Sequence, residues 1–222
     1  MRSKYPERVE SITLEETLPR VFEGDAPRPS EIWRRRVTLR RGTLTVIAAE
    51  SGTGKSSLCS YIYGARRDFS GRILFDGVDT AAIPVEGWQH LRRHSLAYLP
   101  QEMSLFPELT ALQNIELKNS LTGYATRQKI EEWLERLGIA DRVEFKVGRM
   151  SIGQQQRVGI IRALCQPFDF LLLDEPVSHL DAENNRIAAE IIMEEAARQG
   201  GAVVATSVGN HLLLDNPVVC NL

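Results

Sequence analysis

The feature that most constrains this chain is residues 49–56, which read Ala-Glu-Ser-Gly-Thr-Gly-Lys-Ser. They follow an apolar stretch that predicts a strand at 44–48, and they open a helical stretch expected from Lys55 to about residue 66. The segment matches G-x-x-x-x-G-K-[ST], except that Ala49 stands at the first glycine. In such a loop backbone N–H groups surround phosphate oxygens, the lysine adds charge and the hydroxyl can bind Mg²⁺.

The alternative interpretation is a glycine-rich turn between a strand and a helix, with an incidental lysine. It is disfavoured because the segment matches the motif and lies between an expected strand and an expected helix. The residues expected to bind a nucleotide are Glu50, Ser51, Gly52, Thr53, Gly54, Lys55, Ser56 and Ser57.

The rest of the chain alternates strand and helix patterns. Further strands are expected at 37–39, 72–75, 96–99, 170–173 and 202–205, and Asp76-Gly77 predicts a hairpin turn. Between about 102 and 165 the periodicity is helical, with capping-box patterns at Thr110/Gln113 and Ser151/Gln154. We therefore expect a single α/β domain over 1–222. Its core would comprise about 1–101 and 160–222, and a helical insertion about 102–159.

Composition excludes several classes of protein. Twenty-seven Lys+Arg against 29 Asp+Glu leave a charge of −2, which is unlike disordered chains and gives no support to a nucleic-acid partner. No apolar run approaches the ~18 residues of a membrane helix. Three scattered cysteines fit neither a disulfide framework nor a zinc site and favour a reducing, cytosolic setting.

Four further segments narrow the choice among the kinds of protein that have such a phosphate loop. Gln101 follows the strand expected at 96–99, and Ser151-Ile152-Gly153-Gln154 precedes a helix. Asp174-Glu175-Pro176 ends the leucine-rich strand, and Ser178-His179-Leu180-Asp181 follows at once. In this order the set resembles the ATP-binding cassette (ABC) ATPases over nearly the whole chain. Within that family it is most similar to the short cassettes of the lipoprotein-release, macrolide-export and FtsE-like branch.

The resemblance implies a RecA-like core with an N-terminal antiparallel β subdomain, ATP and Mg²⁺ as ligands, and a head-to-tail dimer around two ATP. It implies that Glu175 is the general base, that Asp174 and Ser56 bind Mg²⁺, and that Gln101 senses both the γ-phosphate and the metal. Ser151, Gly153 and Gln154 would form the signature that caps the partner's ATP. Asp181 would connect the two subunits.

The sequence departs from the family's pattern at three places. Ile152 replaces the signature's first glycine, and Ser207 stands where the family has a catalytic histidine. Serine can donate a hydrogen bond but lacks the charge and reach of an imidazole. His211 could substitute if the intervening segment is helical, and otherwise it is a surface histidine. The aromatic residue that stacks on adenine is expected to be Phe22, with Trp33 and Tyr5 as alternatives to it.

These features predict an ATP-hydrolysing subunit on the cytoplasmic face of a membrane, bound there through separate membrane permease subunits. Residues 102–122 would be the docking surface, with an apolar groove of Leu105, Phe106, Leu109 and Leu112 unless these belong to the core. A nucleotide-binding regulatory cassette with weak or lost hydrolysis is the alternative, and Ser207 is its main support. The arginines at 34–36, 40 and 41 predict a solvated strand edge, or else a surface for acidic groups.

Overall fold

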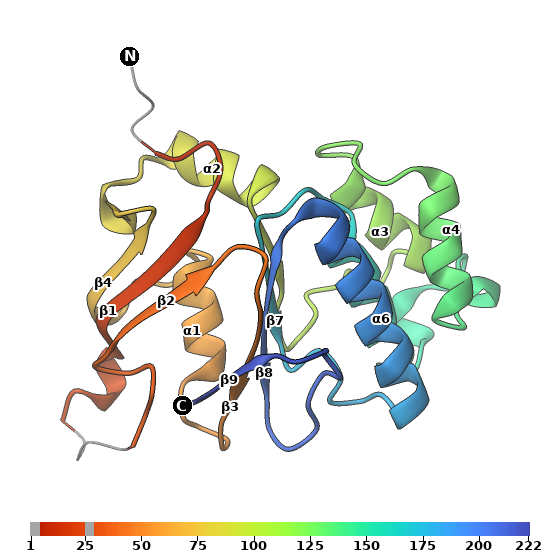
Figure 1. The fold of residues 1–222 in the computed structure, drawn as a ribbon. Helices are drawn as coiled ribbons and strands as arrows, with labels where there is room; N and C mark the ends of the chain where they lie inside the picture. The colour runs from red at the N-terminus through yellow and green to blue at the C-terminus, as the bar shows by residue number, and fades with distance from the viewer. Residues whose placement is uncertain (1–4, 25–28) are drawn as a thin grey trace.

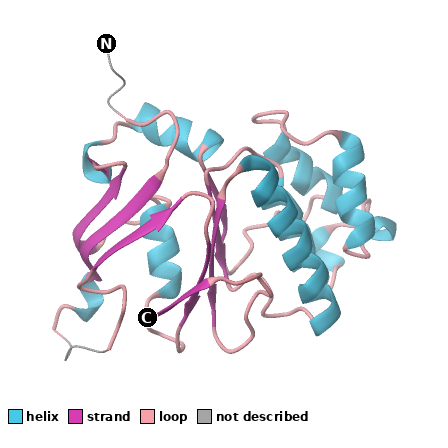
Figure 2. Ribbon diagram, in the orientation of Figure 1, coloured by secondary structure: helices cyan, strands magenta, loops and turns pink. Residues whose placement is uncertain are grey.

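The strands of this protein form two sheets, which lie on either side of helix α1 (Lys55–Ile62) (Figure 1). The computed structural model describes residues 5–24 and 29–222. Figure 2 shows the helices concentrated beyond the second sheet, on the side away from the first. The architecture is α/β, with an antiparallel sheet beside a parallel one, as the sequence predicts.

The first sheet is antiparallel. Its order is β2 (Arg36–Arg40), β1 (Ser11–Pro19), β4 (Phe69–Phe75) and β5 (Val78–Asp79). The hairpin between β4 and β5 turns at Asp76 and Gly77, both with positive φ, which confirms the prediction from this dipeptide. Edge strand β2 carries exposed Arg36, which pairs with Glu15 across 3.4 Å.

The second sheet is parallel. Its order is β6 (Leu96–Leu99), β7 (Phe170–Asp174), β8 (Ala202–Ser207), β3 (Leu44–Ala48) and β9 (Val218–Asn221). Asp174 pairs with Thr206, and Ala48 pairs with Ser207. The carboxyl ends of β7, β8 and β3 therefore meet at one edge, where open α/β sheets place their ligands.

The helices complete both faces of the parallel sheet. They are α2 (Val85–His94), α3 (Ala111–Asn119), α4 (Arg127–Arg136), α5 (Ile152–Leu164) and α6 (Ala182–Gln199). Short 3-10 turns lie at Arg20–Phe22, Thr80–Ala82, Ala140–Arg142 and Val147–Arg149. No helix in the described ranges is long and apolar enough to cross a membrane.

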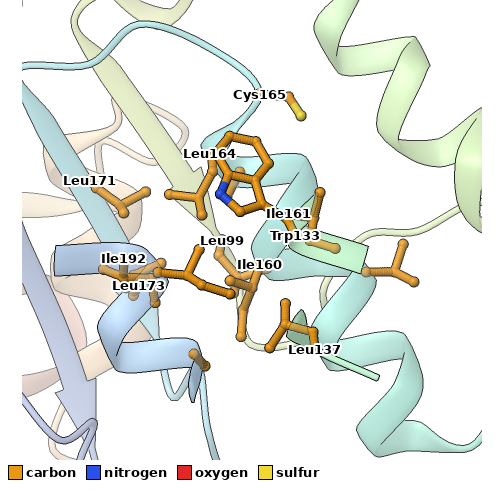
Figure 3. Close-up of a cluster of buried hydrophobic side chains, with 14 of the residues drawn as sticks. Leu99, Trp133, Leu137, Ile160, Ile161, Leu164, Cys165, Leu171, Leu173 and Ile192 are labelled. Carbon is orange, nitrogen blue, oxygen red and sulfur yellow. The ribbon is translucent and has the colours of Figure 1, made fainter. Parts of the chain in front are cut away.

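The parallel sheet separates two hydrophobic cores. In β7, Phe170 and Leu172 face the core shared with α1 and the antiparallel sheet, whereas Leu171 and Leu173 face the core shared with α5 and α6. The second core continues into the helical region 102–159, where Trp133 of α4 is buried with Ile161 and Leu164 of α5 (Figure 3). One continuous core thus joins the helical insertion to the sheet.

The structure corrects the sequence interpretation in three respects. Helix α1 ends at Ile62, not near residue 66, because Gly64 takes a positive φ (72°) above the Trp88 ring. The sequence patterns do not predict β1, α2 and β9. Arg41 does not belong to an exposed basic cluster. Its Nε lies 3.1 Å from buried Asp169, and it donates to the Gln199 carbonyl (2.6 Å).

Candidate active site

The phosphate loop is shaped by glycines and by its own lysine. Gly52 and Gly54 take positive φ angles of 77° and 98°, which L side chains rarely adopt. The Lys55 side chain is only 5% exposed, and its Nζ donates to the Glu50 carbonyl (2.7 Å). The loop thus wraps around its ammonium group at the start of α1, and it departs from the ideal motif only at Ala49.

Trp33 holds the backbone of this loop in place. Its indole Nε1 donates to the Thr53 carbonyl (2.9 Å). A Cβ added at Gly54 would lie 3.1 Å from the Trp33 ring and 3.2 Å from Phe22. Both candidate stacking aromatics therefore pack against the loop, whereas Tyr5 packs on His90 of α2. Of the three, Trp33 is buried and holds the loop's backbone, which leaves Phe22 as the more accessible ring at this position.

The paired carboxylates end β7 with different surroundings. Asp174 is buried, and its Oδ1 accepts a hydrogen bond from the Thr206 hydroxyl (2.7 Å). Glu175 has a positive φ of 50°, and its N–H donates to the carbonyl oxygen and the hydroxyl of Thr206 at 3.2 Å each. Thr206 therefore fixes both residues, and the strained turn carries Glu175 away from the strand direction.

Two of the three predicted catalytic residues, Glu175 and Gln101, lie next to Lys55 and Ser56, whereas among the described residues no hydrogen bond or ion pair joins the Ser207 side chain to either Lys55 or Ser56. The Lys55 ammonium lies 3.7 Å from Glu175 Oε1, and the Ser56 hydroxyl lies 3.4 Å from Gln101 Oε1. These contacts bring together residues from α1, from the end of β7 and from the segment after β6, which are up to 120 positions apart in the chain.

The donor set fits Mg²⁺. Asp174 Oδ2 is buried and has no hydrogen-bond partner, which is costly for a carboxylate oxygen unless a cation or donor faces it. The Ser56 hydroxyl and the Gln101 amide oxygen are also hard oxygen ligands of the kind that Mg²⁺ prefers. No group of three His, Cys, Asp or Glu side chains in the described ranges could hold a metal by itself.

The charge of Asp174 affects its neighbours. The pKa of the Cys59 thiol is raised well above its ordinary value, first by burial and then by the Asp174 carboxylate. Burial likewise raises the pKa of Tyr98, with a smaller contribution from Asp174. Both groups therefore stay neutral at physiological pH, and Cys59 is not a reactive thiol.

The segment after Gln101 is held by α5. Met103 and Ser104 both have positive φ angles, and Arg162 of α5 donates to their two carbonyls, at 2.5 and 2.8 Å. Leu112 of the proposed docking groove is buried and Leu105 packs against the core, whereas Phe106 is exposed. The four leucine and phenylalanine side chains therefore do not form a single exposed groove.

The signature segment begins α5 with the predicted capping box. Ser151 and Gln154 exchange side-chain and backbone hydrogen bonds. A Cβ at Gly153 would lie 2.8 Å from the His179 carbonyl, so only glycine allows this close approach. Buried Gln156 donates to the Glu175 carbonyl (3.0 Å) and accepts from the His179 N–H (2.9 Å). The signature helix is thus tied to the backbone of the predicted base.

Asp181 begins α6 as its N-cap. Its carboxylate accepts from the Asn184 N–H (2.8 Å), and this bond, followed by the Asn184 side chain, lowers the Asp181 pKa. The residue is exposed next to the signature helix, where Arg157 bonds Asn184.

Ser207 ends β8 and is 2% exposed. Its hydroxyl is hydrogen-bonded to His211 Nδ1. The intervening segment is not helical and His211 is exposed, as the surface-histidine alternative expects, although the two side chains still meet. A cavity of about 590 Å³ lies beside them, lined by phosphate-loop residues Ala49, Glu50 and Thr53 and by His211.

Sequence reasoning missed three of four supporting residues, and it considered the fourth, Trp33, only as an alternative stacking aromatic. Thr206, Gln156, Arg162 and Trp33 each act through a backbone contact with a segment distant in sequence. Of these, Gln156 had the clearest signal, because it lies two residues after the capping box.

The parallel sheet and the loop at its carboxyl edge define a phosphate-loop nucleotide-binding protein of the α/β class. The chain belongs to the ABC transporter family, whose model matches residues 34–178.

Similar proteins agree with this placement. The macrolide export ATP-binding/permease protein MacB of Bartonella henselae is 34% identical over 171 residues, which are 76% of this chain and 26% of the relative. The chain therefore spans about a quarter of that relative's length. The uncharacterized ABC transporter ATP-binding protein YvrO of Bacillus subtilis is 36% identical over 172 residues, covering 76% of this chain and 74% of YvrO.

A solved structure shares the fold. It is the dimeric, post-hydrolysis state of the ATP-binding cassette MJ0796 with ADP and Pi, with a TM-score of 0.70 and 25% identity. The alignment covers 88% of this chain and 87% of that one.

Proposed function

We propose that this protein is the ATP-binding and hydrolysing subunit of an ABC transporter. The observation that carries the proposal is the convergence of Lys55, Ser56, Gln101 and Glu175 on one edge of the sheet, next to the unpartnered Asp174 Oδ2. A cationic loop, a carboxylate able to bind a metal and a second carboxylate 3.7 Å from the lysine are the parts that phosphoryl transfer to water requires.

Each residue would then have a distinct part. The amides of residues 50–57 and the Lys55 ammonium bind the β- and γ-phosphates, and Phe22 stacks on the adenine. Ser56, Gln101 and Asp174 would hold Mg²⁺, which neutralises charge on the phosphates when bound. Glu175 accepts a proton from the attacking water, and its fixed turn orients it for this step. Gln101 contacts the part of the site where the γ-phosphate binds. It links the presence of that phosphate to the segment that follows it in the chain.

Two copies of the chain would form a head-to-tail dimer around two ATP. The signature residues Ser151, Gly153 and Gln154 lie at the N-terminus of a 13-residue helix, where backbone N–H groups favour an anion. In the proposed dimer this terminus caps the partner's nucleotide, and Asp181 lies at the contact between subunits. The dimeric form of MJ0796 with ADP and Pi supports this arrangement.

Membrane permease subunits are the expected partners, and they would hold the cassette at the cytoplasmic face. The segment 102–122 offers exposed Phe106, Leu117 and Leu121 just after Gln101. Exposed large apolar side chains within one segment make it a candidate interaction surface. The ATP-binding/permease name of the MacB relative supports a permease partner.

The alternative is a nucleotide-binding regulatory cassette with weak hydrolysis, because Ser207 replaces a residue that carries a larger donor. A phosphate-release assay on the purified chain separates the two. We expect slow hydrolysis that depends on ATP and Mg²⁺, that Glu175→Gln abolishes, and that the exposed control Glu144→Gln leaves unchanged. Binding of ATP with no hydrolysis above the Glu175→Gln background would establish the regulatory alternative.

A further inference from the structure

Ser207 is held rigidly next to the phosphate loop. Its carbonyl accepts from the Ala49 N–H (3.2 Å), and β8 pairs with β3 in parallel register up to this residue. On its other side β8 pairs with β7 up to Asp174. The backbone of Ser207 thus lies between the phosphate loop and the paired carboxylates, so only its side-chain torsion remains to be set.

His211 sets that torsion. Its Nδ1 is hydrogen-bonded to the Ser207 hydroxyl, although the segment between them has no regular structure. Buried Asn185 of α6 holds this segment, because its Nδ2 donates to the His211 carbonyl (2.9 Å) and its Oδ1 accepts from the Leu213 N–H (3.3 Å). Asn210 adds a bond to the Val177 carbonyl (3.0 Å). These three contacts therefore hold the segment that carries His211.

His211 also lies close to residues of the phosphate loop. It lines the cavity of about 590 Å³ together with Ala49, Glu50 and Thr53 of that loop.

We propose, on the basis of the proposed function, that His211 is a positioning residue for ATP hydrolysis that acts through Ser207. The imidazole donates its Nδ1–H to Ser207 Oγ, which leaves the Ser207 O–H free to donate to an oxygen of the attacked phosphate. A free hydroxyl rotates among three staggered positions, and this bond selects one of them. Donors that are oriented before the reaction contribute to the rate because they need no reorganisation in the transition state.

The test is a double-mutant cycle in steady-state ATP hydrolysis by the full chain, with Ser207→Ala, His211→Ala and both together. We expect His211→Ala to lower kcat about tenfold, the scale of one hydrogen bond, with KM for ATP unchanged. In the Ser207→Ala background the same change should have no further effect. His211→Asn should retain most of the activity, because its amide N–H occupies the place of Nδ1–H.

Several outcomes would overturn this role. Equal losses from His211→Ala in both backgrounds, or failure of His211→Asn to rescue, would mean that His211 only anchors the segment 208–213. A raised KM with normal kcat would make it a binding residue. Unfolding midpoints of all variants check that the fold is intact. If hydrolysis is abolished by Glu175→Gln but indifferent to Ser207 and His211, this inference fails while the proposed function stands. If wild type does not hydrolyse ATP, both fail.

Discussion

Lys55 illustrates how one residue can be buried and still serve a ligand. Its ammonium group has two partners, the Glu50 carbonyl and the Glu175 carboxylate, both oriented toward the loop. A charged donor in this place is already desolvated, so its interaction with phosphate is stronger than that of an exposed lysine. Phosphate binding by the loop therefore depends on the burial of Lys55 as well as on the sequence motif.

We expect Lys55→Ala to weaken ATP binding by about 1.5–3 kcal/mol, the range for a hydrogen bond to a charged group. Titration of the purified chain with a fluorescent ATP analogue measures this change. Lys129→Ala on α4 is the control, since it removes a partly exposed ion pair with Glu132. An unchanged affinity in Lys55→Ala would remove the phosphate-loop assignment.

A histidine introduced at Ser207 tests the same site from another direction. Because His211 already supplies an imidazole through the hydroxyl, we expect Ser207→His to change basal hydrolysis little in the wild-type chain. In the His211→Ala background it should raise hydrolysis several-fold with little change in ATP affinity, since it restores one positioned donor. Phosphate release at saturating ATP, measured in both backgrounds, tests these two expectations.

The candidate site was predictable where its chemistry is local in sequence. Lys55 and Ser56 lie in a recognisable loop, and Asp174 and Glu175 end an apolar strand. Thr206 was not predictable, because its role depends on the register of β8 against β7. The Ser207–His211 contact also depends on Asn185, which approaches from α6 and leaves no pattern in the segment itself.

At the scale of elements, capping patterns were reliable predictors. Both predicted capping boxes, Thr110/Gln113 and Ser151/Gln154, are formed. A cap is a contact within four residues, so tertiary packing rarely overrides it. Strand β9 was not predicted because its exposed residues, such as Val218 and Val219, show no alternation, and its pairing with β3 comes from far along the chain.

The N-cap of α6 makes a pH-dependent contribution. Because the Asn184 N–H lowers the Asp181 pKa in the folded chain, the folded state binds fewer protons there than the unfolded state. The stabilisation is thus present above the unfolded value, about 3.9, and is lost as the pH falls below it through the folded value. We expect the stability difference between wild type and Asp181→Ala to shrink from pH 6 to pH 3.5, measured by urea unfolding. A difference that stays constant with pH would contradict this cap.

Trp133 connects α4 to the core and tests how far the helical insertion depends on it. The indole is 1% exposed among side chains of α5. We expect Trp133→Ala to lower the free energy of unfolding by about 3–5 kcal/mol, as for other large core truncations. Exposed Phe145→Ala should have an effect near zero. Denaturant unfolding followed by circular dichroism compares the two variants.

At the scale of the whole molecule, the proposed dimer makes a separate prediction. Glu175→Gln keeps the shape of the side chain but cannot accept a proton, so ATP should remain bound between two subunits. We expect this variant to elute as a dimer in gel filtration with ATP and Mg²⁺, whereas wild type dimerises only transiently. Adding Ser151→Ala, which removes the signature cap, should reduce the dimer. A variant that stays monomeric at high concentrations of protein and ATP would count against the sandwich.

The contacts of Gln156 have a consequence for how two such subunits would behave together. One end of α5 faces the partner's nucleotide in the proposed dimer, while Gln156 ties the same helix to the backbone of Glu175, which serves the chain's own nucleotide. The close approach at Gly153 leaves little room for the helix and this segment to slide. The two nucleotide sites of the proposed dimer would therefore be coupled through α5. The rate of hydrolysis should depend on ATP concentration with a Hill coefficient above one. Removing the side-chain contacts of Gln156 should return this dependence to a simple hyperbola.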